Sequence, residues 1–292
     1  MSAEVAGFTL EQRPVADVRR LSSTVVAAGA YVTAITAAEV LAAFVGVVPA
    51  AALDAALLVA LVTQYLLHAE DLAPDAVAAR ARIFAALTLV PLLRLSTLAM
   101  APGDPLLFHV VSPAPSLHLG RGMSGLLRPE VAGIPLLMAT ILAARVLSLQ
   151  GVLPMSEMRD RSQWCFALAA IAVAGAVTPL LGLGRITDAH GARDFTVVVV
   201  IFFFTGALEE LVFRGLVQGA LDAVVGGWAV PMANALFTAT YLGSGSASYT
   251  LFMCAFGMTC GWWVRRTGSV AGAATAHGLL SVGLLVLWAG LL

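Results

Sequence analysis

Long apolar runs, each near the length of a membrane helix, follow one another along most of this chain. About 20 apolar residues are what an α-helix needs to cross the hydrocarbon core of a bilayer. Hydrophobic residues make up 60% of the 292 residues and charged residues 11%, whereas a soluble domain has about 25% charged residues. The pattern predicts an all-α, polytopic membrane helical bundle, and the length allows about eight or nine transmembrane helices.

The expected spans follow the apolar runs, and no internal repeat is visible. They cover 21–47, 49–67, 83–100, 130–150, 165–183, 195–221, 228–243, 248–264 and 269–291. The first 20 residues are polar, and the apolar run after them is too long for a signal-peptide core. We therefore expect the first span to be an uncleaved anchor.

Arginines in the short loops predict the orientation, because positively charged loops stay in the cytoplasm. With the N-terminus inside, the cytoplasmic side receives Arg13, Arg19, Arg20, Arg80, Arg82, Arg159, Arg161, Arg265 and Arg266. The other side receives Arg121, Arg128, Arg185 and Arg193. We expect an integral membrane protein with a cytoplasmic N-terminus. The lack of lysine and the richness in small apolar residues indicate a GC-rich genome, and hence a bacterial plasma membrane.

Charge and cysteine content exclude two further classes. The net charge of -1 offers no basic surface, so we expect no nucleic-acid partner. Cys165, Cys254 and Cys260 all lie in apolar stretches. This odd, scattered set is neither a disulfide framework nor a CxxC metal site, so we interpret the cysteines as small apolar fillers.

Three ionisable residues interrupt the run that begins near residue 195: Glu209, Glu210 and Arg214, in GALEELVFRG. An ionisable side chain at the centre of a membrane helix costs about 2.5–3.5 kcal/mol, so it persists where it is paired, faces a cavity or has a function. Glu210 and Arg214 share a helix face and can form a neutral pair. Glu209 lies about 100° around the helix and has no basic residue three or four positions on. This second carboxylate favours a functional site over a structural ion pair.

Two later spans carry polar residues at helical spacing. His277 and Ser281 share one face of the last span, although a lone membrane histidine is also typical of a helix–helix contact. Asn234, Phe237 and Tyr241 form a stripe on the span before the last two, a pattern that is more typical of packing.

The depth of these residues decides whether they can meet. At ~1.5 Å per residue, Glu209 lies ~18 Å, Tyr241 ~20 Å and His277 ~15 Å from the inner ends of their spans. We therefore expect that the three side chains can line one polar cavity.

The motifs resemble those of the CPBP membrane proteins, the family of type II CAAX prenyl endopeptidases and of bacterial bacteriocin-processing or immunity relatives. The family pattern is Glu-Glu-x-x-x-Arg, then Phe-x-x-x-His, then His-x-x-x-Asn. EELVFRG resembles the first motif in full, at Glu209, Glu210 and Arg214. The resemblance covers roughly 195–292.

The second and third motifs depart from the family pattern. FTATY stands in place of the second, with Tyr241 where the family has His. HGLLS resembles the third, with His277 matched and Ser281 where Asn or Asp is usual. Tyrosine has a reference pKa of ~10 and cannot act as a base near neutral pH, but its hydroxyl can donate a hydrogen bond.

The resemblance implies an intramembrane endopeptidase of the CAAX protease-like type. In the family, a glutamate and the second-motif histidine activate a water, while the third motif stabilises the oxyanion. Carried over, Glu209 is the base, Glu210 its partner, Arg214 the organiser and His277 the oxyanion donor. Peptide hydrolysis needs a base for water and donors aimed at the oxyanion. The implied partners are the lipid bilayer and a peptide or membrane-protein substrate, which is cleaved at the cytoplasmic side.

This interpretation divides the chain into three parts. Residues 1–20 form a cytoplasmic N-terminal tail, 21–190 form N-terminal transmembrane helices, and 191–292 form a CPBP-like catalytic helical core. We expect no cofactor and no metal, because the chain lacks HExxH and because Arg214 beside a dication is unfavourable.

Two alternatives stay open. The first is a catalytically degenerate CPBP-like scaffold or an immunity or regulatory protein, which the replacements at Tyr241 and Ser281 favour. The second is a transporter, whose pathway residues are Glu39, Asp54, Arg94 and Arg145. Glu39 and Arg94 can equally pair with each other, so their distance from Glu209 discriminates between the hypotheses.

Overall fold

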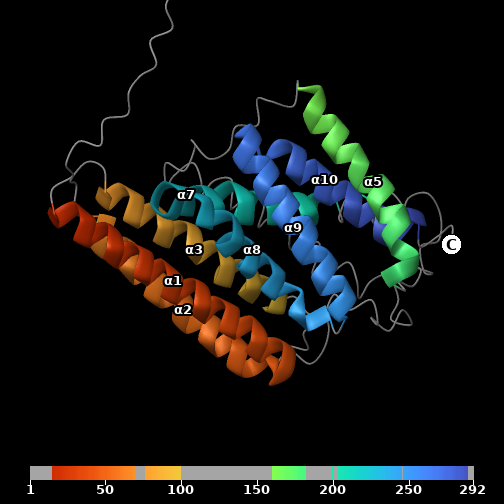
Figure 1. The fold of residues 1–292 in the computed structure, drawn as a ribbon. Helices are drawn as coiled ribbons and strands as arrows, with labels where there is room; N and C mark the ends of the chain where they lie inside the picture. The colour runs from red at the N-terminus through yellow and green to blue at the C-terminus, as the bar shows by residue number, and fades with distance from the viewer. Residues whose placement is uncertain are drawn as a thin grey trace, which may run out of the picture.

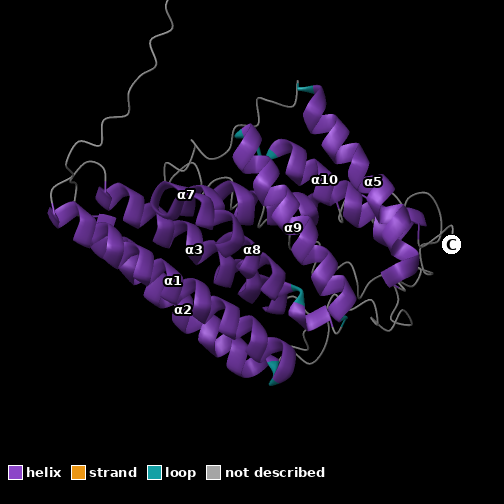
Figure 2. Cartoon of the chain, viewed as in Figure 1, coloured by secondary structure: helices purple, strands orange, loops and turns teal. Residues whose placement is uncertain are grey.

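The computed structural model describes residues 15–69, 76–99, 160–181, 199, 203–244 and 246–288. All regular elements in these ranges are helical (Figure 2), which confirms the all-α prediction for the described residues. The predicted span over 130–150, with Arg145, and residues 1–14 of the predicted tail lie outside these ranges.

Three long helices form the N-terminal part: α1 (Val15–Phe44), α2 (Val47–Ala69) and α3 (Ala76–Ala99). Gly46, with φ of 148°, makes the short turn that folds α2 back along α1, a conformation that favours glycine. Helix α2 packs on both α1 and α3. Helices α1 and α3 begin before the predicted spans, and α2 extends past both ends of its predicted span.

The C-terminal part begins with α5 (Arg161–Leu181). Residues 203–210 are α-helical and lead directly into a π-helix, η3 (Leu211–Gln218), followed by α7 (Gly219–Val225) and the short η4 (Gly226–Trp228). Helix α8 (Ala229–Thr240) ends at η5 (Leu242–Ser244). Helices α9 (Ala247–Thr267), α10 (Ala271–Val282) and η6 (Gly283–Leu287) complete the described chain.

Local signals explain the limits of α9. The Ser246 side chain accepts a hydrogen bond from the Tyr249 N–H, which caps the first turn. Gly268 ends the helix in a left-handed conformation, with φ of 72°, and its N–H bonds to the Val264 carbonyl. The chain can then turn back into α10.

The two parts of the chain pack on each other (Figure 1). Helices α1 and α3 contact α7, and α1 also contacts α8 and η5, while α3 contacts η3. On the other side, α8 packs on α9, and α5 packs on α10. The π-helix η3 is therefore surrounded by α3, α8 and α9, and all of its residues are buried.

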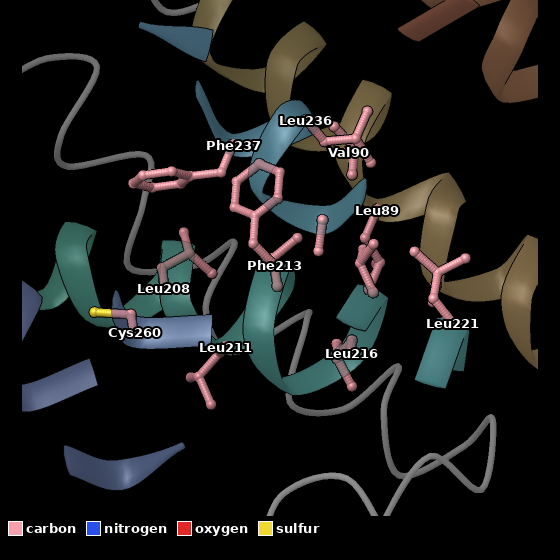
Figure 3. Packing of buried hydrophobic residues seen from close by; sticks show 14 of the residues in the cluster. Leu89, Val90, Leu208, Leu211, Phe213, Leu216, Leu221, Leu236, Phe237 and Cys260 are labelled. Carbon is pink, nitrogen blue, oxygen red and sulfur yellow. The ribbon is translucent and has the colours of Figure 1, made fainter. Parts of the chain in front are cut away.

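Apolar side chains fill the space between η3, α3 and α8. Figure 3 shows Phe213 and Phe237 beside each other, with Leu236 and Val90 close by. The two phenylalanine rings meet edge to face with centroids 5.5 Å apart. Such buried aromatic pairs contribute about 0.5–1.5 kcal/mol beyond their area burial. This packing fixes the rotation of η3 relative to α8. That rotation determines where the polar side chains of the two helices point.

Four segments of the described residues are long and apolar enough to cross a membrane: Ser23–Phe44, Val47–His68, Arg161–Leu181 and Phe203–Ser244. Large apolar side chains such as Val26, Leu180 and Leu251 point outward. An apolar outer surface on apolar helices is typical of a protein surrounded by lipid. The chain is an integral membrane protein with several apolar helices.

Candidate active site

The segment that carries the first motif lies directly against α10. At Gly206, an added Cβ would come within 2.9 Å of the His277 backbone carbonyl carbon and of the Gly278 nitrogen. Only a residue without a side chain permits such a close approach of two helices. The approach brings Glu209 and Glu210, on the next turn, to the His277 side chain.

Glu210 is fully buried and has a hydrogen-bonding or ion-pair partner on each side. Its Oε1 lies 2.9 Å from His277 Nδ1, and its Oε2 lies 3.3 Å from Arg214 Nε. The predicted pair of Glu210 and Arg214 is confirmed, but its helical context differs from the expected α-helix. The pair spans the start of η3, and π-helical turns of this kind occur frequently at functional sites.

Arg214 is buried, with only 1% of its side chain exposed, and it contacts further side chains besides Glu210. Its Nη2 donates to Asn234 Oδ1 at 3.1 Å, and its Cζ lies 3.9 Å from the centre of the Phe237 ring. Helix α9 also lies close, since a Cβ at Gly257 would collide with both Arg214 Nη2 and Asn234 Oδ1. Glycine at this position therefore leaves the space that the guanidinium occupies.

Asn234 connects this arrangement to α9. Its amide Nδ2 donates to the Cys254 carbonyl at 3.2 Å, while its Oδ1 accepts from Arg214. A primary amide that donates on one side and accepts on the other has a defined orientation. Asn234 thus ties η3, α8 and α9 together through polar contacts.

Glu209 points to the other two motifs. Tyr241 Oη donates to Glu209 Oε2 at 2.7 Å, and His277 Nε2 lies 3.9 Å from the same oxygen. The Tyr241 Oη to His277 Nε2 distance is 3.5 Å. Glu209 is 21% exposed, whereas Glu210 is 0% exposed. Glu209 is therefore the more accessible of the two carboxylates.

Aromatic rings surround His277 and Tyr241. Phe237 and Phe256 meet the His277 ring edge to face, with centroids at 5.7 and 5.3 Å. Tyr249 packs on Tyr241 with centroids at 5.7 Å. These rings exclude water from the sides of the polar cluster, and hydrogen bonds are stronger in such a low-dielectric environment.

The structure brings together five of the six residues that the sequence analysis selects. Glu209, Glu210, Arg214, Tyr241 and His277 are joined by the contacts above, and the expected meeting of three spans is confirmed. Ser281 is half-buried on α10 and makes no hydrogen bond to another described residue.

Sequence reasoning missed Asn234 and Gly257. The stripe of Asn234, Phe237 and Tyr241 is interpreted above as packing, but all three side chains contact the polar cluster. A polar residue at helical spacing from Tyr241 is the signal that could have identified Asn234. Gly257 carries no such signal, because its role depends on the Arg214 and Asn234 side chains that pack against it.

Comparison with known families gives one match. Residues 191–283 match the family described as Type II CAAX prenyl endopeptidase Rce1-like. The match confirms the resemblance of this part of the chain to the CPBP family of type II CAAX prenyl endopeptidases. No curated protein and no solved structure matches the chain. The Rce1-like region contains every residue of the polar cluster, from Glu209 to His277.

A second set of ionisable residues with low exposure lies outside the Rce1-like region, among α1, α2 and α3. Arg94 Nε is 3.0 Å from Glu39 Oε2. Asp54 is buried nearby, and the charges of both residues act on it. The expectation that Glu39 and Arg94 pair with each other is confirmed, and neither contacts Glu209 among the interactions of the described residues.

The His, Cys, Asp and Glu side chains are the residues that could bind a metal ion. Within the described ranges, no three His, Cys, Asp or Glu side chains are arranged to hold a metal ion. The three cysteines are free thiols, and only Cys260 is fully buried. His68 lies in the last turn of α2, with Nδ1 2.7 Å from the Gln64 carbonyl oxygen.

Proposed function

We propose that the protein is an intramembrane endopeptidase of the CAAX protease-like type. Glu209 accepts a proton from a water molecule, and the resulting hydroxide attacks a peptide carbonyl. The observation that carries the proposal is the convergence of Glu209, Tyr241 and His277, three proton-handling groups within 3.9 Å of one another. General base catalysis requires such a group within hydrogen-bonding reach of the attacking water.

Glu209 and Glu210 have different roles because their surroundings differ. Glu210 is occupied by Arg214 on one side and by His277 on the other, and it is fully buried. Glu209 forms no ion pair with an arginine of the described residues, and 21% of its side chain is exposed. Glu209 therefore takes the proton from water, and Glu210 holds the other groups in place.

The proposal extends to the whole chain. Residues 1–20 are a cytoplasmic tail, 21–190 are N-terminal transmembrane helices, and 191–292 are the catalytic core. The chain crosses a bacterial plasma membrane about eight or nine times, with the N-terminus in the cytoplasm. The ion pair between Arg265 and Asp222, at 3.4 Å, supports a shared membrane side for the ends of α7 and α9.

The substrate class follows from the position of the site. Glu209 lies within the segment Phe203–Ser244, which is long and apolar enough to cross a membrane. A substrate peptide must reach the bilayer to contact it. We infer that the substrate is a leader peptide or a membrane-protein segment, cleaved near the cytoplasmic side.

One observation favours a second candidate, a scaffold without catalysis. Tyr241 stands where the family has histidine, and its hydroxyl occupies Glu209 at 2.7 Å. A site closed in this way could bind a partner helix and serve as an immunity or regulatory protein. A transporter has less support, because Glu39 and Arg94 pair with each other away from Glu209.

Cleavage of a quenched fluorescent peptide library by the purified protein tests the proposal. We expect cleavage by the wild type and a loss of about 10²–10⁴-fold in Glu209→Gln, the range for a lost general base. The matched control is Asp222→Asn, which removes an exposed carboxylate near the end of the same segment. It should retain wild-type activity. We also expect activity to survive a metal chelator.

Three results would change the conclusion. Equal losses in Glu209→Gln and Asp222→Asn would indicate general destabilisation and not a lost base. Activity that appears only in Tyr241→His would identify a protease scaffold inactivated at that position. Activity abolished by chelator and restored by a divalent cation would contradict the metal-free mechanism.

A further inference from the structure

The protonation of the His277 ring is determined by Glu210. Glu210 Oε1 lies 2.9 Å from His277 Nδ1, while its Oε2 faces the guanidinium of Arg214. Arginine is always cationic in proteins, so it favours the ionised form of the neighbouring carboxyl group. An ionised carboxylate only accepts hydrogen bonds. His277 Nδ1 must therefore carry the hydrogen of this contact.

The carboxylate cannot easily turn away from the ring. Arg214, which binds its other oxygen, is itself held by Asn234 and by the Phe237 ring. The backbone of α9 also lies close at Gly257, since even a Cβ there would collide with the guanidinium. A buried carboxylate that holds Nδ1–H in this way fixes both the tautomer and the orientation of an imidazole.

With Nδ1 protonated, the neutral ring has a lone pair on Nε2. This atom faces Glu209 Oε2 at 3.9 Å and Tyr241 Oη at 3.5 Å. A nitrogen with a lone pair accepts a proton and cannot donate a hydrogen bond to an oxyanion. The neighbouring Tyr241 hydroxyl, in contrast, carries a hydrogen that it can donate to an oxyanion. Ser281 makes no hydrogen bond within the described residues that would orient it toward the site.

We propose that His277 carries the proton to the leaving amine and that Tyr241 donates the hydrogen bond to the oxyanion. This assignment rests on the endopeptidase function proposed above. In the family pattern, the second motif handles the proton and the third motif stabilises the oxyanion. In this chain the two roles are exchanged, because Tyr241 of the second motif stabilises the oxyanion and His277 of the third motif carries the proton. The exchange also gives a role to the tyrosine in the second motif.

The steps balance for hydrolysis of one amide bond. Glu209 takes a proton from water, the water oxygen bonds to the carbonyl carbon, and the carbonyl π electrons move to the oxygen. Tyr241 O–H donates to this oxyanion. The proton passes from Glu209 to His277 Nε2 and then to the substrate nitrogen. The C–N bond breaks, the oxyanion re-forms C=O, and an acid and an amine leave.

Two matched substrates separate the two roles. The first is a cleaved peptide found by the library screen, and the second is an ester of its N-terminal half with nitrophenol. Nitrophenolate leaves without a proton, so the ester does not need the group that protonates the amine. In His277→Gln, the amide side chain still donates a hydrogen bond but transfers no proton. We expect its amide hydrolysis to fall about 10²–10⁴-fold and its ester hydrolysis to change much less.

Tyr241→Phe provides the complementary variant. It keeps the ring that packs on Phe237 and Tyr249 and removes only the hydroxyl. Loss of one oxyanion donor lowers the rate about 10²–10³-fold, and it acts on amide and ester alike. Asp222→Asn again serves as the control and should hydrolyse both substrates at the wild-type rate.

A second readout does not depend on turnover. Nitrogen NMR of histidine-labelled protein in detergent reports which ring nitrogen carries the hydrogen, and His277→Gln identifies the signal. We expect His277 to be protonated at Nδ1 and to lose this preference in Glu210→Ala.

The outcomes distinguish this inference from the proposed function. Equal losses on amide and ester in His277→Gln, or a ring protonated at Nε2 alone, overturn the inference while the endopeptidase function stands. A wild-type protein that hydrolyses neither substrate refutes the endopeptidase function and, with it, the proton transfer.

Discussion

Substitution of Gly257 by alanine tests whether α9 holds the arginine of the site. In an ordinary helix, Gly→Ala stabilises by about 0.8–1.0 kcal/mol. At Gly257, the new Cβ would collide with Arg214 Nη2 and with Asn234 Oδ1, since ordinary contacts begin at 3.4 Å. Both side chains must therefore move away from α9, which disrupts the 3.1 Å hydrogen bond between them.

The expected magnitude follows from the bond that is lost. A hydrogen bond to a charged group contributes about 1.5–3 kcal/mol. After the gain in helix propensity, we expect Gly257→Ala to reduce the free energy of unfolding by about 0.5–2 kcal/mol. Gly29→Ala in α1 is the matched control, because nothing lies within 4 Å of its added Cβ. It should stabilise the protein by up to about 1 kcal/mol.

Equilibrium unfolding in mixed micelles, followed by tryptophan fluorescence, measures both variants. Both variants gain the same helix propensity, so this gain cancels in the difference between their free energies of unfolding. We expect that difference to be about 1.5–3 kcal/mol. If Gly257→Ala is as stable as Gly29→Ala, the close contact between α9 and Arg214 is not part of the folded protein, and the reasoning fails. Peptide cleavage should also fall in Gly257→Ala and remain unchanged in Gly29→Ala.

Two further substitutions test other buried polar contacts by the same unfolding measurement. Arg94→Met leaves Glu39 without the arginine that it pairs with, and it should lower the free energy of unfolding by about 3–5 kcal/mol. The double variant Glu39→Leu with Arg94→Leu should recover most of this loss. Wild-type stability in Arg94→Met would contradict the ion pair. Trp263→Phe removes the 3.0 Å hydrogen bond to Gln163 Oε1 and should cost about 0.5–1.5 kcal/mol. No change in stability would mean that this contact between α9 and α5 contributes nothing.

The amino-acid sequence determined the helical fold class and much of the helix arrangement along the chain. Runs of apolar residues near the length of a membrane span predict helices, and α1, α2, α5 and α9 lie close to the predicted ranges. The pairing of Glu210 with Arg214 also follows from sequence, because residues four apart share a helix face. These features depend only on neighbours along one helix.

The tertiary structure decided how the polar groups divide their roles. Tyr241 contacts Glu209 across 32 residues of sequence, and His277 contacts Glu210 across 67. Such contacts depend on the rotation of each helix about its axis. Helices in lipid are apolar on all sides, so the sequence pattern does not mark the buried face. Packing around Gly206, Gly257 and the π-helix sets those rotations, and only then does one glutamate face His277 Nδ1 and the other face Tyr241.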